Sequence, residues 1–200
     1  AMLRAMRRGH GGERMYKVVE RLRRAITDMV FRTTFIVGHP GETDADFEEL
    51  RSFVEWAEFD HVGVFLYSPE EGTRSVGMAD PVESAVAEAR REALMETQRP
   101  ISRDRLHLRV GTELDVLVEG LSDESDLLLQ GRWWGQAPEV DGSVYLANGT
   151  ARIGEIRRVL VTDAADYDLV ADFIDGPQGR DAPPDAKDPR LSKVKLRTVS

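Results

Sequence analysis

The feature that most constrains the fold of this chain is a strand-to-helix junction in its first quarter. Phe35, Ile36 and Val37 form a short apolar run that favours a β-strand, and a glycine-rich turn ends this run at once. Thr43 and Asp46 follow with the spacing of a capping box, which predicts the start of a helix. Such junctions lie at the carboxyl ends of strands in α/β folds, where glycine lets a ligand approach the backbone. The pattern fits a ligand site, and it also fits a plain connection.

The neighbouring residues extend this junction into alternating helices and strands. Apolar residues recur at helical spacing before it, over residues 15–26, and after it, over residues 47–57. A second apolar run, residues 61–67, predicts another buried strand, and a loop at residues 68–73 follows. This alternation predicts right-handed βαβ units and a parallel sheet. Both loops then fall on the same rim, where parallel α/β barrels carry their chemistry.

A long helix is predicted after the second loop. Asp80 is expected as its N-cap, Pro81 at its first position and Glu83 at its third. Pro100 lacks a backbone N–H group, so we expect it to kink or end this helix.

The composition changes at Gly111, and short strands follow. Leu114, Val116 and Val118 alternate with acidic residues, which is the pattern of a half-buried strand. Turn-rich segments separate this strand from four further apolar runs, at residues 127–130, 144–147, 157–161 and 167–173. Five short strands in about sixty residues predict a small antiparallel barrel, similar in size to an OB-fold.

Three parts are therefore expected: an α/β part at residues 1–110, a small all-β barrel at residues 111–176, and a flexible tail at residues 177–200. The tail has too few apolar residues to pack. The chain has no cysteine, so it offers no disulfide and no thiolate to a metal, and its four histidines lack ligand spacing, so we expect no metal site. No apolar run approaches the roughly 18 residues of a membrane span, and we expect a cytoplasmic protein.

Three motifs carry a resemblance to a known family. They are Arg32–Thr43, Phe65–Thr73, and Arg132 together with Ala137–Tyr145. Through them the chain resembles the carboxyl-terminal half of the radical-SAM methylthiotransferases, and most of all the branch that modifies a ribosomal protein. The family usually has an aromatic residue where this chain has His39. The resemblance implies a partial parallel (β/α) radical-SAM barrel, followed by a five-stranded antiparallel OB-like barrel called TRAM.

The resemblance also implies a chemistry. In this family a 4Fe-4S cluster reduces S-adenosylmethionine to a radical that abstracts hydrogen from carbon, and a second cluster takes part in sulfur delivery. In the ribosomal-protein branch, the β-carbon of an aspartate gains a methylthio group. Because this chain has no cysteine, we expect it to ligate neither cluster, to lack the amino-terminal domain, and to be inactive alone. The resemblance assigns no catalytic residue to it.

The resemblance implies two sets of binding residues. The expected contacts of S-adenosylmethionine are Arg32, Ile36, Gly38, Glu42, Phe65 and Tyr67. Arg32 either pairs with the carboxylate of this cofactor or forms a surface salt bridge at the strand entrance. The expected substrate contacts, on the barrel, are Trp133, Trp134 and Asp141. In a barrel this small, at least one of the two tryptophans is expected in the core.

The charge of the barrel bears on its partner. Residues 111–176 contain fourteen acidic residues and four arginines, a net charge of −10. RNA binding depends on basic side chains that neutralise phosphates, so this charge favours a basic small-subunit ribosomal protein or the ribosome as partner. We expect a monomer that binds neither nucleic acid nor membranes. The alternatives are a fragment of the tRNA-modifying branch, an RNA-binding module, or an inactive structural module whose acids keep it soluble.

Overall fold

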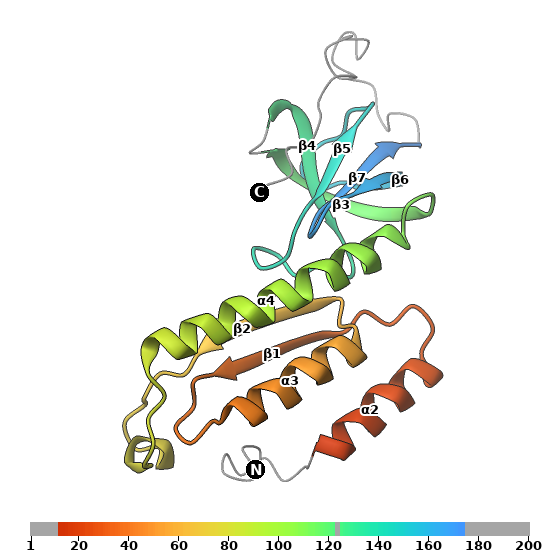
Figure 1. Cartoon of the computed structure of the whole chain (residues 1–200). Coiled ribbons are helices and arrows are strands. Elements are labelled where there is room, and N and C mark those ends of the chain that lie inside the picture. Colours follow the sequence, from red (N-terminus) through yellow and green to blue (C-terminus); the bar gives the residue numbers. More distant parts are fainter. Residues whose placement is uncertain (1–11, 123–124, 175–200) are drawn as a thin grey trace. The chain divides into compact units, whose positions relative to one another are not determined.

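The computed structural model describes residues 12–122 and 125–174 of the 200-residue chain (Figure 1). The chain divides into two compact units, Ala1–Ser102 and Arg103–Ser200. The predicted tail at residues 177–200 lies outside the described residues.

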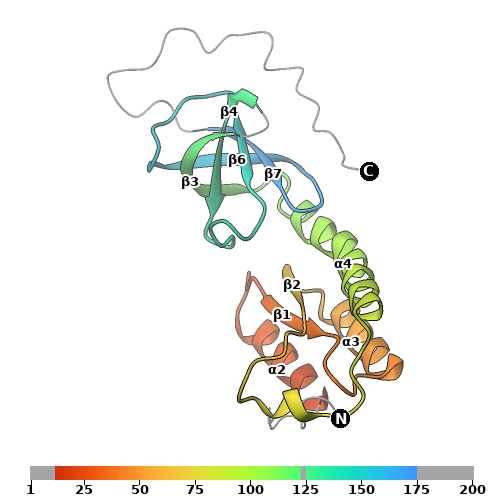
Figure 2. The same ribbon diagram turned by 90° about the vertical axis from the view of Figure 1, so that its left-hand side faces the viewer.

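The first unit is built on a two-stranded parallel sheet. Its elements in chain order are α2 (Gly12–Ala25), β1 (Arg32–Val37), α3 (Asp44–Ala57), β2 (His61–Leu66), the 3-10 helix η1 (Arg74–Gly77) and most of α4 (Ser84–His107), whose last turn is counted with the second unit. The strands pair in register from Arg32 beside His61 to Val37 beside Leu66. Figure 2 shows α3 on one side of the two strands. The predicted βαβ unit is confirmed.

The core of this unit lies between the helices and one face of the sheet. Phe35 and Val37 of β1 and Val62 and Val64 of β2 point toward the helices and join two apolar clusters. The buried members of the clusters come from the helices, the end of β1 and the flanking loops: Val19, Phe31, Phe53, Ala57 and Phe59 in one, and Val37, Phe47, Val54 and Leu94 in the other. Burying such a side chain contributes about 1.5–3 kcal/mol.

The predicted capping box at the start of α3 is confirmed. The hydroxyl of Thr43 accepts the N–H of Asp46 at 3.1 Å, and the carboxylate of Asp46 accepts the N–H of Thr43 at 3.2 Å. The hydrogen bond from the Thr43 hydroxyl holds the pKa of Asp46 below its usual value, because it stabilises the charged form.

The start of α4 differs from the prediction. The helix begins at Ser84, three residues after Pro81, and the N–H of Ala87 donates to the carbonyl of Glu83 at 3.0 Å. Asp80 has a φ of 62°, in the left-handed region, whereas an N-cap residue needs extended backbone. The expected N-cap at Asp80 is therefore wrong.

The helix also continues through Pro100 to His107, so the expected end of the helix at this proline is wrong, and the alternative, a kink, stays a prediction. Pro100 has no N–H for the carbonyl one turn earlier, but Gln98 and Ser102 on either side of it are buried and hold the helix in place. Neither α4 nor any other helix in the described part of the chain is long and apolar enough to cross a bilayer.

The second unit contains a closed five-stranded barrel (Figure 1). Its strands are β3 (Glu113–Ser122), β4 (Ser125–Trp133), β5 (Val144–Ala147), β6 (Ile156–Ala164) and β7 (Leu169–Phe173), in the spatial order β3-β4-β5-β7-β6. β6 pairs with β3 and closes the ring. The predicted small barrel is confirmed.

One strand pair departs from the predicted antiparallel arrangement. β5 and β7 are parallel, and the other four pairs are antiparallel. The cause is the closure: β6 runs antiparallel to both β3 and β7, which gives β7 the direction of β5. The predicted alternation in the first strand is confirmed, since Leu114, Val116 and Val118 are all buried.

Candidate functional site

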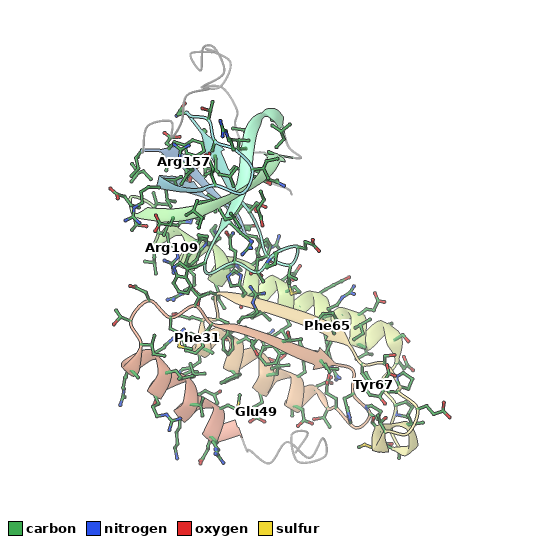
Figure 3. All side chains as sticks on the ribbon, turned by 180° about the vertical axis from the view of Figure 1, so that it is seen from behind. Phe31, Glu49, Phe65, Tyr67, Arg109 and Arg157 are labelled. Carbon is green, nitrogen blue, oxygen red and sulfur yellow. The ribbon has the colours of Figure 1, made fainter. Side chains whose placement is uncertain are left out.

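Within the described part of the first unit, no element covers the face of the two-stranded sheet that points away from the helices, and this face is called the open face below. It carries Arg32, Thr34 and Ile36 from β1, and Gly63 and Phe65 from β2. Ile36 is 47% exposed and Phe65 is 62% exposed, and the two are direct neighbours across the strands. Figure 3 labels Phe65 on β2. Parallel sheets are normally covered on both faces. An exposed apolar pair at this position marks a surface suited to a bound molecule.

Gly63 leaves the middle of this open face flat. A Cβ atom at this position would lie 3.6 Å from both the Phe65 ring and the hydroxyl of Thr34, which is ordinary contact. Packing does not demand glycine here. Gly63 places no side chain of its own between Thr34 and Phe65.

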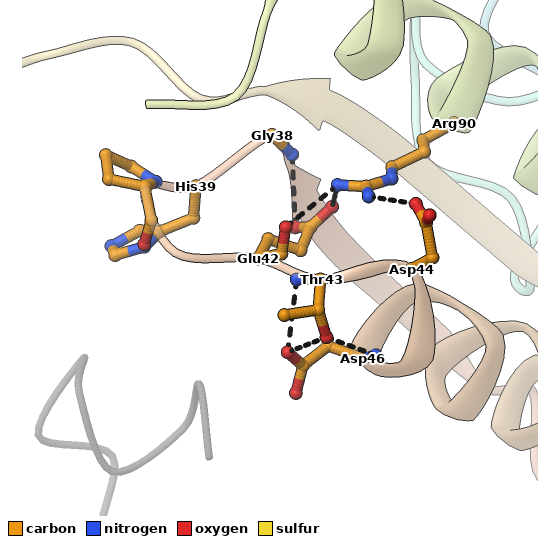
Figure 4. Close-up of polar contacts among 8 residues, drawn as sticks. Gly38, His39, Glu42, Thr43, Asp44, Asp46 and Arg90 are labelled. Atoms are coloured by element: carbon orange, nitrogen blue, oxygen red, sulfur yellow. Dashed lines mark hydrogen bonds and ion pairs between the residues drawn. The ribbon is translucent and has the colours of Figure 1, made fainter. Parts of the chain in front are cut away.

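The turn after β1 is held from inside by Glu42 (Figure 4). The side chain of Glu42 is 7% exposed, and its Oε2 atom accepts the N–H of Gly38 at 3.1 Å. Its Oε1 atom accepts a hydrogen bond from Arg90 of α4 at 2.7 Å. The turn is thereby fixed to a helix that comes much later in the sequence.

Arg90 joins two carboxylates. Its second nitrogen, Nη2, donates to Oδ1 of Asp44 at 2.6 Å, and its guanidinium lies 5.8 Å from the ring centre of Phe47. Burial lowers the pKa of Arg90, but the hydrogen bond to Asp44 and the charge of Glu42 outweigh this effect and raise it above its usual value. Arg90 was not predicted from the sequence, because it lies 48 residues from Glu42 and outside every motif.

Gly38 is required by packing as well as by backbone conformation. Its φ is 80°, and a Cβ atom there would lie 2.5 Å from the Cβ of Ala87 on α4. The side of Gly38 that a larger residue would occupy therefore faces α4. The neighbouring His39 is buried, and its ring meets the edge of Tyr67 at 5.1 Å between centres.

The structure divides the six predicted cofactor contacts into two groups. Arg32, Ile36 and Phe65 lie on the open face. The other three, Gly38, Glu42 and Tyr67, belong to the turn and the residues that pack against it. The hydroxyl of Tyr67 is buried and has no hydrogen-bond partner among the described residues.

Of the three predicted substrate contacts, only one is widely exposed. Trp133 is 2% exposed, and the guanidinium of Arg109 lies 4.0 Å from its ring centre. Trp134 is 68% exposed and meets Trp133 edge-on. Asp141 accepts the N–H of Ala137 at 2.7 Å and so shapes its own loop. The expectation that at least one tryptophan lies in the core is confirmed.

One arginine of the barrel is buried, and two others are paired with acidic side chains. The side chain of Arg157 is 3% exposed, and its guanidinium donates to the carbonyl of Thr150 at 2.8 Å. Arg132 pairs with Glu119 at 2.7 Å, and Arg158 pairs with two acidic residues of β3 at 3.1 Å each. The described arginines therefore leave the acidic charge that the sequence predicts for the barrel largely uncompensated.

Two family descriptions match the chain. The radical SAM superfamily matches residues 2–54, and the TRAM domain matches residues 110–174. With the parallel strands of the first unit and the closed barrel of the second, they identify a radical-SAM protein that carries a TRAM domain. The chain belongs to the radical-SAM methylthiotransferase family.

Three relatives carry the name ribosomal protein uS12 methylthiotransferase RimO. The protein of Sorangium cellulosum is 56% identical over 88% of this chain and 36% of its own length. That of Syntrophobacter fumaroxidans is 49% identical over 83% and 37%, and that of Anaeromyxobacter sp. (strain K) is 45% identical over 97% and 41%. The chain thus spans little more than a third of the length of these relatives.

Proposed function

We propose that this chain is part of an enzyme that adds a methylthio group to the β-carbon of an aspartate in ribosomal protein uS12, by radical S-adenosylmethionine chemistry. The observation that carries this proposal is its 45–56% identity to the three uS12 methylthiotransferases over 83–97% of its residues. Sequence identity of this extent includes the strands, the turn and the barrel together.

The open face of the sheet fits S-adenosylmethionine. Ile36 and Phe65 offer an apolar surface to the adenine and ribose, and Gly63 adds no side chain between Thr34 and Phe65. Arg32, at the other end of β1, supplies a positive charge for the carboxylate of the cofactor. When bound, the cofactor supplies the radical that removes hydrogen from the substrate. The chain itself binds and orients this cofactor and shields it from water.

The residues of this chain do not fit an iron-sulfur cluster. Such clusters are held by cysteine thiolates, and the sequence contains none. We propose that both 4Fe-4S clusters of the complete enzyme are held outside this chain. Anaerobic reconstitution of the chain with iron and sulfide is expected to leave no stoichiometric cluster, as judged by visible absorption and bound iron.

The barrel, proposed to occupy residues 111–176, is assigned to the protein substrate. Its surface is acidic, whereas a ribosomal protein that contacts RNA is basic, so the two attract each other. Trp134 provides an exposed aromatic anchor. A phosphate backbone would be repelled, so we propose no direct nucleic-acid binding. The enzyme is proposed to act as a monomer in the cytoplasm.

A chimeric enzyme tests this function. In the relative from Sorangium cellulosum, this chain replaces the segment that it matches, and the chimera is reconstituted with iron and sulfide without oxygen. Incubation with S-adenosylmethionine, reductant and uS12 should yield a peptide whose mass has increased by a methylthio group in place of hydrogen. Tandem mass spectrometry should place the group on an aspartate.

The parent relative serves as the positive control, and tRNA serves as the competing substrate. Modification of tRNA in preference to uS12 would show that the chain belongs to the tRNA-modifying branch. A chimera that folds and holds both clusters but modifies neither substrate would contradict the proposed function altogether.

A further inference from the structure

Arg90 closes a chain of contacts that leads from α4 to the end of β1. It binds Oε1 of Glu42 at 2.7 Å, and the other oxygen of the same carboxylate binds the N–H of Gly38 at 3.1 Å. Gly38 directly follows β1, two residues beyond Ile36 of the open face. The position of this strand end therefore depends on a carboxylate that Arg90 holds.

The ion pair between Arg90 and Glu42 is buried, which makes it sensitive to the loss of either partner. The side chains are 8% and 7% exposed. A carboxylate buried without its cation would turn toward water or take up a proton. In either case the hydrogen bond to Gly38 would weaken, and the turn would lose its internal support.

We propose that Arg90 is a positioning residue for S-adenosylmethionine: by holding Glu42, it fixes the Gly38–Glu42 turn and the adjacent end of the cofactor-binding face. This inference rests on the proposed function for the identity of the ligand. Both oxygens of Glu42 have partners within the chain, so Glu42 acts in the same way, through the backbone of the turn.

Asp44 has a different part in this arrangement. Its side chain is 96% exposed although it binds Arg90 at 2.6 Å. Ion pairs with exposed side chains contribute little free energy, because water screens the charges. Asp44 therefore orients the guanidinium of Arg90 but contributes little to the stability of the turn. Removing Asp44 should therefore have far less effect than removing Glu42.

Amide hydrogen exchange in the chain itself gives a test that needs no cofactor. In Arg90→Met, the Gly38 amide is expected to exchange about tenfold faster, while amides in the middle of α3 keep their rates. Arg91→Met is the matched control, because Arg91 is the next residue and its side chain is 41% exposed. Equal acceleration of all amides in the unit would instead make Arg90 a general stabilising residue and overturn the proposal.

The affinity for S-adenosylmethionine is then measured in the reconstituted chimera by equilibrium dialysis. Arg90→Met should bind about tenfold more weakly than the unsubstituted chimera, and Arg91→Met should bind equally well. Glu42→Gln should weaken binding to a similar extent, and the double variant should be no weaker than the singles by more than about twofold. Arg90→Lys, which keeps the charge beside Glu42, should recover most of the affinity.

These measurements separate the two proposals. If the unsubstituted chimera binds no S-adenosylmethionine, the proposed function and this inference both fail. If it binds the cofactor and Arg90→Met binds it equally well, only the positioning role fails. Should Arg90→Met not fold, Glu42→Gln decides: unchanged affinity in that variant contradicts the role, and weakened affinity in a folded variant supports it.

Discussion

Gly38 and Gly41 lie in the same turn, and replacing a glycine there has two possible costs. One is the cost of a left-handed backbone for a residue with a side chain, and the other is the cost of a steric collision. Gly38 and Gly41 both have a φ of 80°, but a Cβ atom at Gly41 would have no neighbour within 4 Å, whereas one at Gly38 would collide with Ala87. The sequence suggested that glycine is needed here for a ligand to approach. The structure gives a reason that operates without any ligand.

Gly41→Ala should therefore lower the free energy of unfolding by about 1–2 kcal/mol, the cost of placing alanine in the left-handed region. Gly38→Ala should cost more, by at least about 1 kcal/mol beyond that, because α4 must also shift. Urea denaturation of the two variants measures the difference. Equal losses of unfolding free energy in the two variants would show that α4 can shift to make room for the methyl group without a measurable cost.

The capping box of α3 adds a dependence on pH. The pKa of Asp46 is lowered in the folded chain, so its contribution to stability is fully present above the unfolded value and is lost as pH falls through the folded one. Thr43→Ala should cost about 1 kcal/mol at pH 7. Below about pH 4 this cost should shrink, since protonated Asp46 no longer needs the hydroxyl. Thermal unfolding between pH 7 and pH 3 gives the comparison, and a loss that does not vary with pH would contradict it.

Helix α4 contains a proline, Pro100, which is unfavourable inside a helix. Pro100 lies inside the helix and its side chain is exposed, so it removes one backbone hydrogen bond. Pro100→Ala should raise the free energy of unfolding by up to about 3 kcal/mol. Arg99→Ala, at the exposed preceding residue, should change it by less than about 0.5 kcal/mol. A loss of stability in Pro100→Ala would show that the helix has adapted to the proline.

The elements also show what sequence can predict. The capping box at Thr43 and the alternation in β3 depend on residues a few positions apart, so their patterns were sufficient. The N-cap expected at Asp80 failed because its carbonyl accepts the N–H of Gly41, a partner far back in the chain. Arg90 and Glu42 were not paired for the same reason. The net charge of the barrel was predictable, because it is a sum over residues and does not depend on which residues contact one another.

At the scale of the whole molecule, charge sets the expected partner. The chain should bind purified uS12 with an affinity that falls several-fold between low and physiological salt, and should show no measurable affinity for tRNA. Fluorescence anisotropy with labelled uS12 and labelled tRNA measures both. Tighter binding to tRNA at physiological salt would contradict the assignment of the barrel.

The anchor on the barrel can be tested in the same assay. Trp134→Ala should weaken binding of uS12 about tenfold, because a large exposed ring is the usual centre of such a contact. Ile153→Ala is the control, since Ile153 is 71% exposed and lies outside the predicted substrate contacts. A similar loss in both variants would point to a general effect on the barrel.

The two sheets of this chain differ in how they end. The barrel closes on itself through β3 and β6, so every strand in it has two neighbours, whereas in the described part of the chain β1 and β2 each have one. An unpaired strand edge is a template on which another copy can add its own strand. When the purified chain is concentrated or stored, aggregates should therefore grow from β1 and β2, while the barrel stays intact inside them.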